Sequence, residues 1–530
     1  MLQSSLRRNV VGEAVAAREK SATSAANAGA LALALILAFA VARFGFDLSL
    51  GFGVDEAYTL TIARRLAWSY FDHPPLHQWI AHVAALALGE GSLARLPFVA
   101  LFAVTGWLIF ALTRDLFGAR AGLWAIFALN VTPFFFASAG AWIVPDGPLL
   151  LALAAAALLL SRLFFAPRAN AWILWLAAGL CFGLAGLSKY NAALVALGLV
   201  LFLALSRRQR HWLGHPAPYC AALLAVAIVA PVFYWNVEND WVSFLFQGGR
   251  AAPTGHWRLT QVAAMALAEF ALLSPWIAAP LIGGLVAAAR QARRGEDDGR
   301  RLFLLCLALP SIILFTLTPL WGARGLPHWP MPGWLFAYPL LGAWLAEEKM
   351  RRVPLRAWAV GSAALLAVLT LAAVAQADGA WLTRVIPSLA AGVDPTLETV
   401  SWSALNEAPA LRDLPGRTFI VATKWNEAGK IAQSLGPARP VMVFSEDPRG
   451  FAFLDDPAHF IGEDAVIIVA QKRLQPTIAA LSPYFASLDP PQSLSLGRAG
   501  RAEIDLSLVR AHCLLRAYPL PYPPRTGATP

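Results

Sequence analysis

Apolar runs of roughly 17 to 25 residues recur along the chain from residue 28 to about residue 375. A helix of about 20 apolar residues crosses a hydrocarbon core of about 30 Å, so these runs predict a polytopic membrane protein. The composition agrees, because 58% of the 530 residues are hydrophobic and only 14% are charged. We expect about eleven spans, near residues 28–47, 93–113, 119–138, 146–163, 171–187, 191–206, 216–235, 258–288, 302–320, 329–346 and 355–375.

Basic residues predict how these spans are oriented. They precede the first span and then fall on alternate loops, around residues 7–20, 114–120, 162–168, 207–210, 290–301 and 349–352. The positive-inside rule therefore makes the N-terminus cytoplasmic and the opposite loops periplasmic in a bacterial inner membrane. The formal net charge of +10 is mostly this signal, and we expect no nucleic-acid partner.

The composition changes after residue 375, which predicts two domains: a transmembrane catalytic domain, 1–376, and a periplasmic soluble α/β domain, 377–530. The second contains short β-type runs at 418–422, 441–444 and 465–470, separated by helix-like segments. It has no glycine-rich phosphate loop, HExxH or CxxC motif, so the chemistry is expected in the outer loops of the first domain.

The first outer loop, residues 48–92, contains two helical stretches, 55–69 and 76–89, that we expect to lie as amphipathic helices in the membrane interface. Pro74-Pro75 separates them, because a residue before proline is disfavoured in the α region. A second interfacial element is predicted at 235–250. Together these elements indicate a roofed cavity that opens to lipid.

Acidic residues are the first candidates for a functional site. Carboxylates at the mouth of a membrane bundle are costly to bury, so they indicate function by default. Asp55 and Glu56 point about 100° apart on a helix, and either can instead cap the helix that follows. Asp146 can likewise be a helix cap or a site residue. Asp72 can be a turn-forming residue or a site residue.

Lys189 is a cation at the outer junction of two spans, against the positive-inside trend. An anionic ligand would explain it, and a snorkelling side chain is the alternative. The other candidates on this face are basic or aromatic: His73, Arg250, Arg324, His328, Tyr58 and Tyr190. Cations and carboxylates next to lipid suit transfer of a group carried on a phosphorylated lipid, with the cations binding phosphate and a carboxylate accepting a proton. No cofactor is predicted, and a divalent metal ion near the carboxylates stays open, although no His or Cys ligand spacing indicates one.

Several motifs together resemble the type C glycosyltransferases of family 39. They are the acidic pair, the run Tyr70-Phe71-Asp72-His73-Pro74-Pro75-Leu76, Pro145-Asp146-Gly147-Pro148, Ser188-Lys189-Tyr190, and residues 235–250, which begin with Trp-Asn, contain Phe-Gln and end in Arg250. The group includes bacterial enzymes similar to protein O-mannosyltransferases and to the aminoarabinose transferase of lipid A. The resemblance covers nearly all of residues 28–350.

The resemblance implies a helical bundle with interfacial helices and an undecaprenyl-type polyprenyl-phosphate-sugar donor. The sugar would be transferred, with inversion, to a periplasmic-face acceptor such as lipid A, the lipopolysaccharide core, another glycolipid or a protein. By this likeness Asp55 and Asp146 are catalytic, and the donor is bound by Lys189, Arg250, His73, Asp72, Glu56, Tyr58, Tyr190, Arg324 and His328. Aminoarabinose transferases usually have Glu-Lys before the two prolines. This chain has Asp72-His73, which leaves aminoarabinose and lipid A open.

Two other classes of protein share some of these sequence features. A transporter or flippase would use the outer carboxylates and Lys189 in a substrate or proton pathway, but the ionisable residues cluster on one face, with Glu269 alone well inside a span. No inverted repeat is visible in the hydropathy either. A scaffold with a periplasmic binding domain is disfavoured by the cost of burying so many charges without use.

Overall fold

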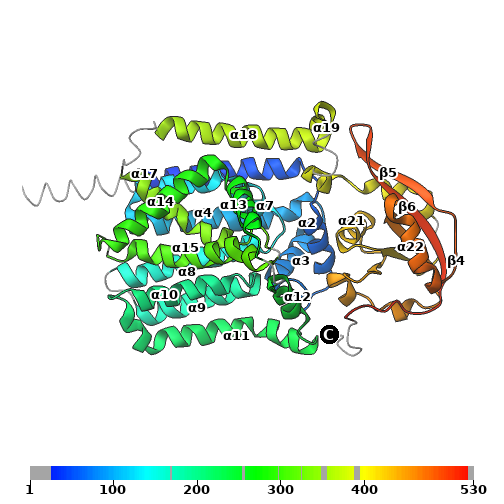
Figure 1. The fold of residues 1–530 in the computed structure, drawn as a ribbon, viewed down its shortest axis with the longest axis horizontal. Coiled ribbons are helices and arrows are strands. Elements are labelled where there is room, and N and C mark those ends of the chain that lie inside the picture. The colour runs from blue at the N-terminus through cyan, green and yellow to red at the C-terminus, as the bar shows by residue number, and fades with distance from the viewer. Residues whose placement is uncertain are drawn as a thin grey trace, which may run out of the picture.

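The computed structural model describes residues 26–166, 170–253, 257–296, 298–323, 325–347, 355–386, 394–412 and 414–522. Long helices form a bundle, and a small sheet domain built from the C-terminal part of the chain lies at one end of it (Figure 1). The predicted fold class, a mainly α multi-pass membrane protein with a C-terminal α/β domain, is confirmed.

Within the described residues, seven helices are long and apolar enough to cross a membrane. They are Ala26–Leu48, Ser92–Phe117 (η1 Ser92–Arg95 with α4 Leu96–Phe117), α8 Asp146–Phe165, α9 Ala171–Ser188, α11 Pro216–Glu238, Arg300–Trp321 (α15 Arg300–Leu317 with η3 Thr318–Trp321) and α18 Leu355–Gly379. Two bent pairs raise this number to nine if each is one span: α5 Ala119–Asn130 with Pro133–Ala141 (α6 Pro133–Phe136 and α7 Ser138–Ala141), and α13 Leu259–Leu273 with α14 Pro275–Arg293.

The predicted number of about eleven spans is not confirmed, and two segments account for the difference. Residues 191–206 form α10, Ala192–Leu205, whose 14 residues reach only about 21 Å at 1.5 Å per residue. Residues 329–346 are divided between two short helices, α16 Met331–Leu335 and α17 Ala337–Ala346. Helix α17 packs on α5 and most of its residues are buried, so it is apolar through burial inside the bundle. Helix α10 packs on α15 along one face and exposes apolar side chains, among them Val200 and Leu205, on another, but it is too short to count as a full span.

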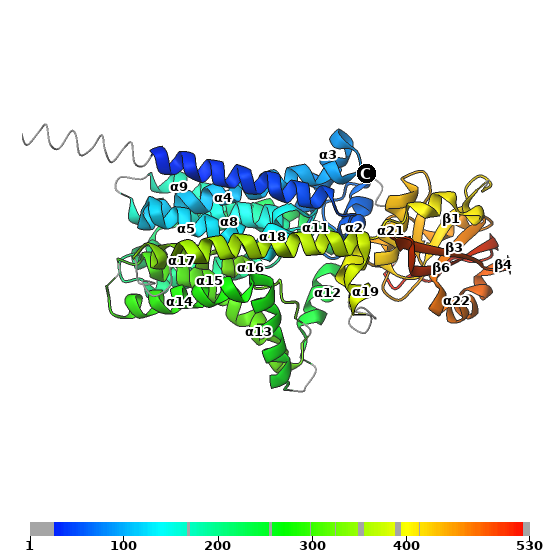
Figure 2. The same ribbon diagram turned by 90° about the horizontal axis from the view of Figure 1, so that it is seen from above.

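The first outer loop differs from its prediction at one helix. The first helix there, α2, covers Val54–Ala63, shorter than the stretch predicted, and every residue from Glu56 onward is buried. It lies between the bundle and the C-terminal domain, so it is not an interfacial helix open to lipid (Figure 2). The two later elements, α3 Leu76–Leu88 and α12 Val242–Ala251, do expose apolar side chains, among them Leu86 and Leu245.

The C-terminal domain is built on a six-stranded mixed sheet with the order β2-β1-β3-β6-β4, and β5 also pairs with β6. Strands β1 Phe419–Ala422, β2 Val441–Val443 and β3 Ala465–Ala470 are parallel to one another and correspond to the three predicted runs. Strands β4 Phe485–Leu488, β5 Gln492–Arg498 and β6 Arg501–Leu514 form the antiparallel side. Helices α21 Trp425–Leu435 and α22 Leu474–Leu481 pack against the sheet.

Helix α21 docks this domain directly on α2. A Cβ atom at Gly429 would lie 2.8 Å from the backbone nitrogen of Tyr58, so only glycine allows the two helices to approach this closely. The next residue, Lys430, is buried, and its Nζ donates to the carbonyls of Phe52 (2.7 Å) and Glu398 (2.9 Å). Burial lowers the pKa of Lys430 to about 8. The domain is thus attached to the loop that carries Asp55.

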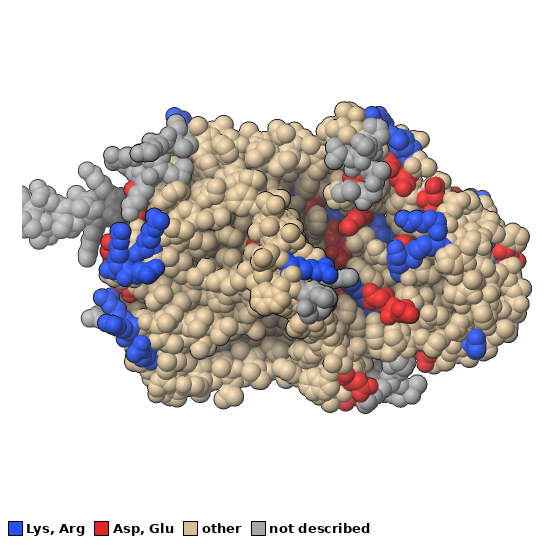
Figure 3. Space-filling view, in the orientation of Figure 1, with Lys and Arg blue, Asp and Glu red and all other residues tan. Residues whose placement is uncertain are grey.

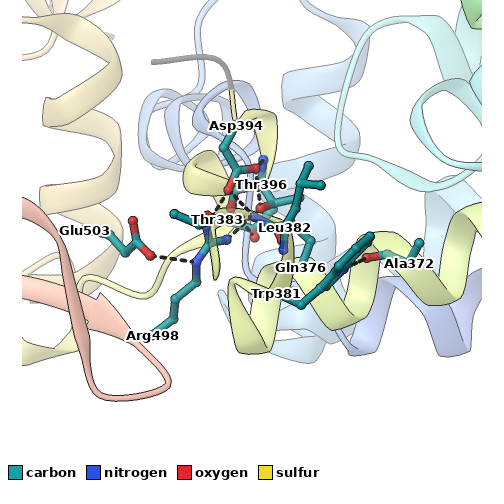
Figure 4. Close-up of polar contacts among 10 residues, drawn as sticks. Ala372, Gln376, Trp381, Leu382, Thr383, Asp394, Thr396, Arg498 and Glu503 are labelled. Carbon is teal, nitrogen blue, oxygen red and sulfur yellow. Dashed lines mark hydrogen bonds and ion pairs between the residues drawn. The ribbon is translucent and has the colours of Figure 1, made fainter. Parts of the chain in front are cut away.

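A polar network ties the same domain to the last span (Figure 4). Arg498 of β5 forms a buried ion pair with Asp394 and donates to Thr396 Oγ1 at 2.6 Å. Gln376 of α18 donates to the same Asp394 carboxylate at 2.6 Å. Burial raises the pKa of Asp394, but the hydrogen bonds from Thr396, Arg498 and Gln376 outweigh it and bring the pKa down to about 2.

Replacing Arg498 by methionine keeps most of its packing and removes the counter-charge of Asp394. We expect Arg498→Met to lower the stability of the C-terminal domain by about 1.5–3 kcal/mol, the usual contribution of hydrogen bonds to charged groups. The measurement is thermal unfolding of the full chain in detergent. Arg501→Met is the matched control, because Arg501 is exposed at the start of β6. Equal unfolding temperatures for the two variants would contradict a stabilising role.

Candidate active site

A buried ion pair fixes the turn between the first span and α2. Arg95, in η1, donates to both carboxylate oxygens of Glu56, at 2.8 and 2.6 Å, and each side chain is 1% exposed. Its remaining N–H groups donate to the carbonyls of Asp47, Leu50 and Gly51. Glu56 also accepts from the backbone N–H groups of Gly53 (3.0 Å) and Ile143 (3.2 Å). The structure thus places Glu56 in the capping role that the sequence left open, with its carboxylate fully engaged.

The side chain of Asp55, the neighbouring residue, is not enclosed like that of Glu56: part of it is open to solvent, although protein atoms surround it closely enough to desolvate its carboxyl group. Acidic side chains line a hollow between the bundle and the C-terminal domain (Figure 3). Desolvation raises the pKa of the Asp55 carboxyl group, and the charges of Arg449, Lys189 and Arg250 offset only part of that effect. A carboxylate made more basic in this way is suited to accepting a proton.

Asp72 is near enough to Asp55 for their charges to interact, and it is held by Tyr58. The Tyr58 hydroxyl donates to Asp72 Oδ1 at 3.2 Å and accepts from the backbone N–H of Gly450 at 3.0 Å. Arg449 Nη1 lies 3.8 Å from Asp72 Oδ2. Burial raises the pKa of Asp72 to about 6. The structure therefore places Tyr58 as a link between Asp72 and the C-terminal domain.

Lys189 and Asp146 form a second buried ion pair. Lys189 Nζ donates to the two Asp146 oxygens at 3.0 and 2.9 Å, and their side chains are 6% and 7% exposed. Asp146 begins α8 and Lys189 directly follows α9, so the ends of two packed spans bring these residues together. The amino group of Lys189 is thus held by a carboxylate inside the protein and does not extend to the surface, as a snorkelling lysine would.

Three imidazoles surround this pair: His73, His77 and His328. Burial, helped by nearby positive charge that includes Lys189, lowers the pKa of His73 well below its usual value and that of His328 to about 4. Burial also lowers the pKa of His77 to about 3. The rings of His73 and His77 meet edge to face with their centroids 5.6 Å apart. At neutral pH these rings are uncharged, and each can both donate and accept a hydrogen bond.

Arg250 closes the site from α12. Its guanidinium lies over the rings of Trp329 (4.8 Å to the centroid) and Phe246 (5.6 Å). Tyr190 packs on Phe244 at 5.3 Å between ring centroids. Arg324, also predicted for this site, lies outside the described residues. In the described part of the chain no group of three or more His, Cys, Asp or Glu residues is arranged to hold a metal ion.

Two residues of the site were missed from the sequence. His77 lies in the first turn of α3, four residues after His73, so its closeness in sequence to a candidate histidine was a signal that was available. Arg449 comes from the C-terminal domain and stacks on Trp425 with its guanidinium carbon 3.8 Å from the ring centroid. Nothing in the local sequence of Arg449 indicates this position.

Residues 72–235 match the family model described as dolichyl-phosphate-mannose-protein mannosyltransferase. The fold matches ArnT from Cupriavidus metallidurans bound to undecaprenyl phosphate, with 20% identity, a TM-score of 0.59, and coverage of 90% of this chain and 97% of that one. The chain has the type C glycosyltransferase fold. The apo state of the same ArnT matches with 19% identity, a TM-score of 0.59 and the same coverage.

A more distant match is the oligosaccharyltransferase AglB from Archaeoglobus fulgidus, with 14% identity, a TM-score of 0.44, and coverage of 84% of this chain and 70% of that one. No curated protein matches the chain by sequence. The resemblance predicted from the motifs is thus confirmed by the family model and by the ArnT fold.

The adjacent carboxylates allow a paired test of position. Glu56→Gln weakens the buried partner of Arg95, and removing one member of a buried pair costs about 3–5 kcal/mol. We therefore expect Glu56→Gln to lower the unfolding temperature clearly, whereas Asp55→Asn, one residue away, does not. Differential scanning calorimetry of both variants in one detergent checks this. Equal losses would show that Asp55 is also part of the structural framework.

The raised pKa of Asp55 predicts how stability depends on pH. A carboxyl group whose pKa is higher in the folded than in the unfolded state stabilises the fold below its unfolded pKa and loses that contribution as pH rises through its folded pKa. Asp55→Asn removes this loss. We expect the unfolding temperature of the variant, relative to the unaltered chain, to rise from pH 4 to pH 8. A difference that is independent of pH would contradict the raised pKa.

Proposed function

We propose that this protein is an integral membrane glycosyltransferase that transfers a sugar from a polyprenyl-phosphate donor to an acceptor at the end of the bundle that faces the C-terminal domain. The observation that carries the proposal is the surroundings of Asp55, a carboxylate whose pKa is raised by desolvation and on which the charges of Lys189 and Arg250 act. The ArnT structure of the same fold, which holds undecaprenyl phosphate, supports this class of donor.

In the proposed reaction Asp55 accepts the proton of an acceptor hydroxyl or amine. The acceptor atom forms a bond to the anomeric carbon as the bond from that carbon to the phosphate oxygen breaks, with inversion at the carbon. The electron pair of the broken bond stays on the polyprenyl phosphate, whose new charge is stabilised by Arg250 and Lys189. Asp146 holds Lys189 in place, and His73 and His328 bind sugar hydroxyls as neutral rings.

We further propose a bacterial inner-membrane location with the C-terminal domain in the periplasm. Basic side chains gather at the end of the bundle away from that domain, as the positive-inside rule requires for a cytoplasmic end (Figure 3). A glycolipid such as lipid A or its core is the favoured acceptor, because α12 and α3, the helices that carry Arg250 and His77, also expose the apolar side chains of Leu245 and Leu86. A protein hydroxyl is the alternative acceptor.

One contact argues against the transporter hypothesis. Glu269, the carboxylate within α13, accepts hydrogen bonds from Thr316 (2.8 Å) and from the Trp334 indole (3.4 Å). These bonds join α13 to α15 and α16, which gives Glu269 a structural use. The ionisable side chains described above are concentrated at one end of the bundle, rather than along a path through it.

The test compares the intact masses of glycolipids from cells with and without this protein. We expect a sugar-sized mass to be lost in the deletion, restored by the unaltered chain and by Asp115→Asn, and not restored by Asp55→Asn. Asp115 is the matched carboxylate, because it pairs with Arg114 and Arg162 at the opposite end of α4. Loss of a general base costs about 10²- to 10⁴-fold in rate. Unchanged glycolipids and envelope glycoproteins would overturn the proposal.

A further inference from the structure

We propose that the C-terminal domain supplies part of the donor site and that Arg449 binds the donor phosphate together with Arg250. This inference rests on the proposed function and extends it, because it assigns a ligand contact to a domain whose sequence shows no site of its own. The ligand is a phosphate ester carried on a polyprenyl chain, because that is the anion that the proposed reaction releases.

The first observation is that two guanidinium groups share one aromatic ring. Arg449 and Arg250 lie over Phe246, with their guanidinium carbons 5.5 and 5.6 Å from its centroid. One comes from the C-terminal domain and the other from α12 of the membrane bundle. Two positive charges near each other repel. Burial lowers the pKa of Arg250, and the charge of Arg449 lowers it further. An anion bound between them would relieve the repulsion.

The second observation is that Arg449 has hydrogen-bonding capacity to spare. Its nearest carboxylate oxygens are Asp447 Oδ2, 3.6 Å from Nε, and Asp72 Oδ2, 3.8 Å from Nη1. Both distances exceed the 2.7–2.9 Å typical of charge-assisted hydrogen bonds. Its Nε is buried without a hydrogen-bond partner among the described residues. By contrast, Arg95 and Arg498 each bind carboxylates at short range.

The third observation is that Arg449 is held in place at some cost. Its φ angle of 48° is in the left-handed region, which costs a non-glycine residue about 1–2 kcal/mol. The neighbouring Gly450 N–H donates to Tyr58, and Trp425 packs flat against the guanidinium, so α2 and α21 together fix its position. Such strain is typical of functional positions, and a planar guanidinium so fixed can bind two phosphate oxygens at once.

The test measures binding of undecaprenyl phosphate to the purified full chain in detergent micelles, alongside KM and kcat for the sugar-carrying donor. We expect Arg449→Gln to raise Kd and KM at least tenfold with a smaller change in kcat. Arg449→Lys should recover part of the affinity, because it restores the charge without the planar fork. Arg417→Gln is the matched control, since Arg417 is an exposed cation of the same domain.

The outcomes separate the two proposals. If the unaltered chain neither binds undecaprenyl phosphate nor transfers sugar, the proposed function fails, and the role of Arg449 fails with it. If the unaltered chain does both and Arg449→Gln matches it in Kd and KM, only the assignment of Arg449 is overturned. Equal loss of binding in the Gln and Lys variants, with lowered unfolding temperatures, would assign Arg449 to docking of the domain and would also overturn phosphate binding.

Discussion

The ion pair between Arg95 and Glu56 is the contact on which the rest of the site depends. Burying two charges is costly, and their attraction repays the cost only where hydrogen bonds satisfy both groups, as they do here. By binding Glu56 and three carbonyls of the preceding turn, Arg95 fixes both the start and the rotation of α2. Because successive helix residues point about 100° apart, holding Glu56 inward turns Asp55 toward the hollow.

Helix α2 is in turn the surface on which the two domains meet. Tyr58 and Ile62 are part of the same apolar cluster as Ile431 and Phe451 of the C-terminal domain, so separating the domains would expose this cluster to water. The polar contacts of Lys430 and Tyr58 lie on the same junction. The C-terminal domain is therefore part of the wall of the site.

Hydropathy predicted the long spans well because a lipid-facing helix must be both apolar and about 20 residues long. It overcounted at α17, which is apolar because it is buried against neighbouring helices, and at α10, which is apolar but too short to cross the hydrocarbon core. The three buried strands of the C-terminal domain were predicted because a short apolar run between polar turns has few other structures. Helix α2 was wrongly expected at a lipid interface. It is buried by the C-terminal domain, which follows hundreds of residues later, and the local sequence of α2 does not show that contact.

The site residues likewise divide into those that the sequence could predict and those that depend on contacts between distant segments. Lys189 was found through its charge, which conflicts with its side of the membrane, and the structure pairs it with Asp146. The two roles open to Glu56 could be separated only by knowing that Arg95 binds it, a contact between distant segments. Arg449 follows Ser445-Glu446-Asp447-Pro448, a polar run typical of a surface turn. Only docking of the domain brings it to Asp72 and Phe246.

The placement of base and cations in one hollow has a consequence for the proposed reaction. Before transfer, Lys189, Arg250 and Arg449 partly compensate the charge of Asp55. As Asp55 takes up the proton it loses that charge, and in the same step the leaving phosphate gains one. In the proposed reaction the cations therefore stop compensating the charge of Asp55 in the same step in which they begin to stabilise the charge on the leaving phosphate. Since Lys189 stays bound to Asp146, the larger change falls on Arg250 and Arg449, the two guanidinium groups that share Phe246.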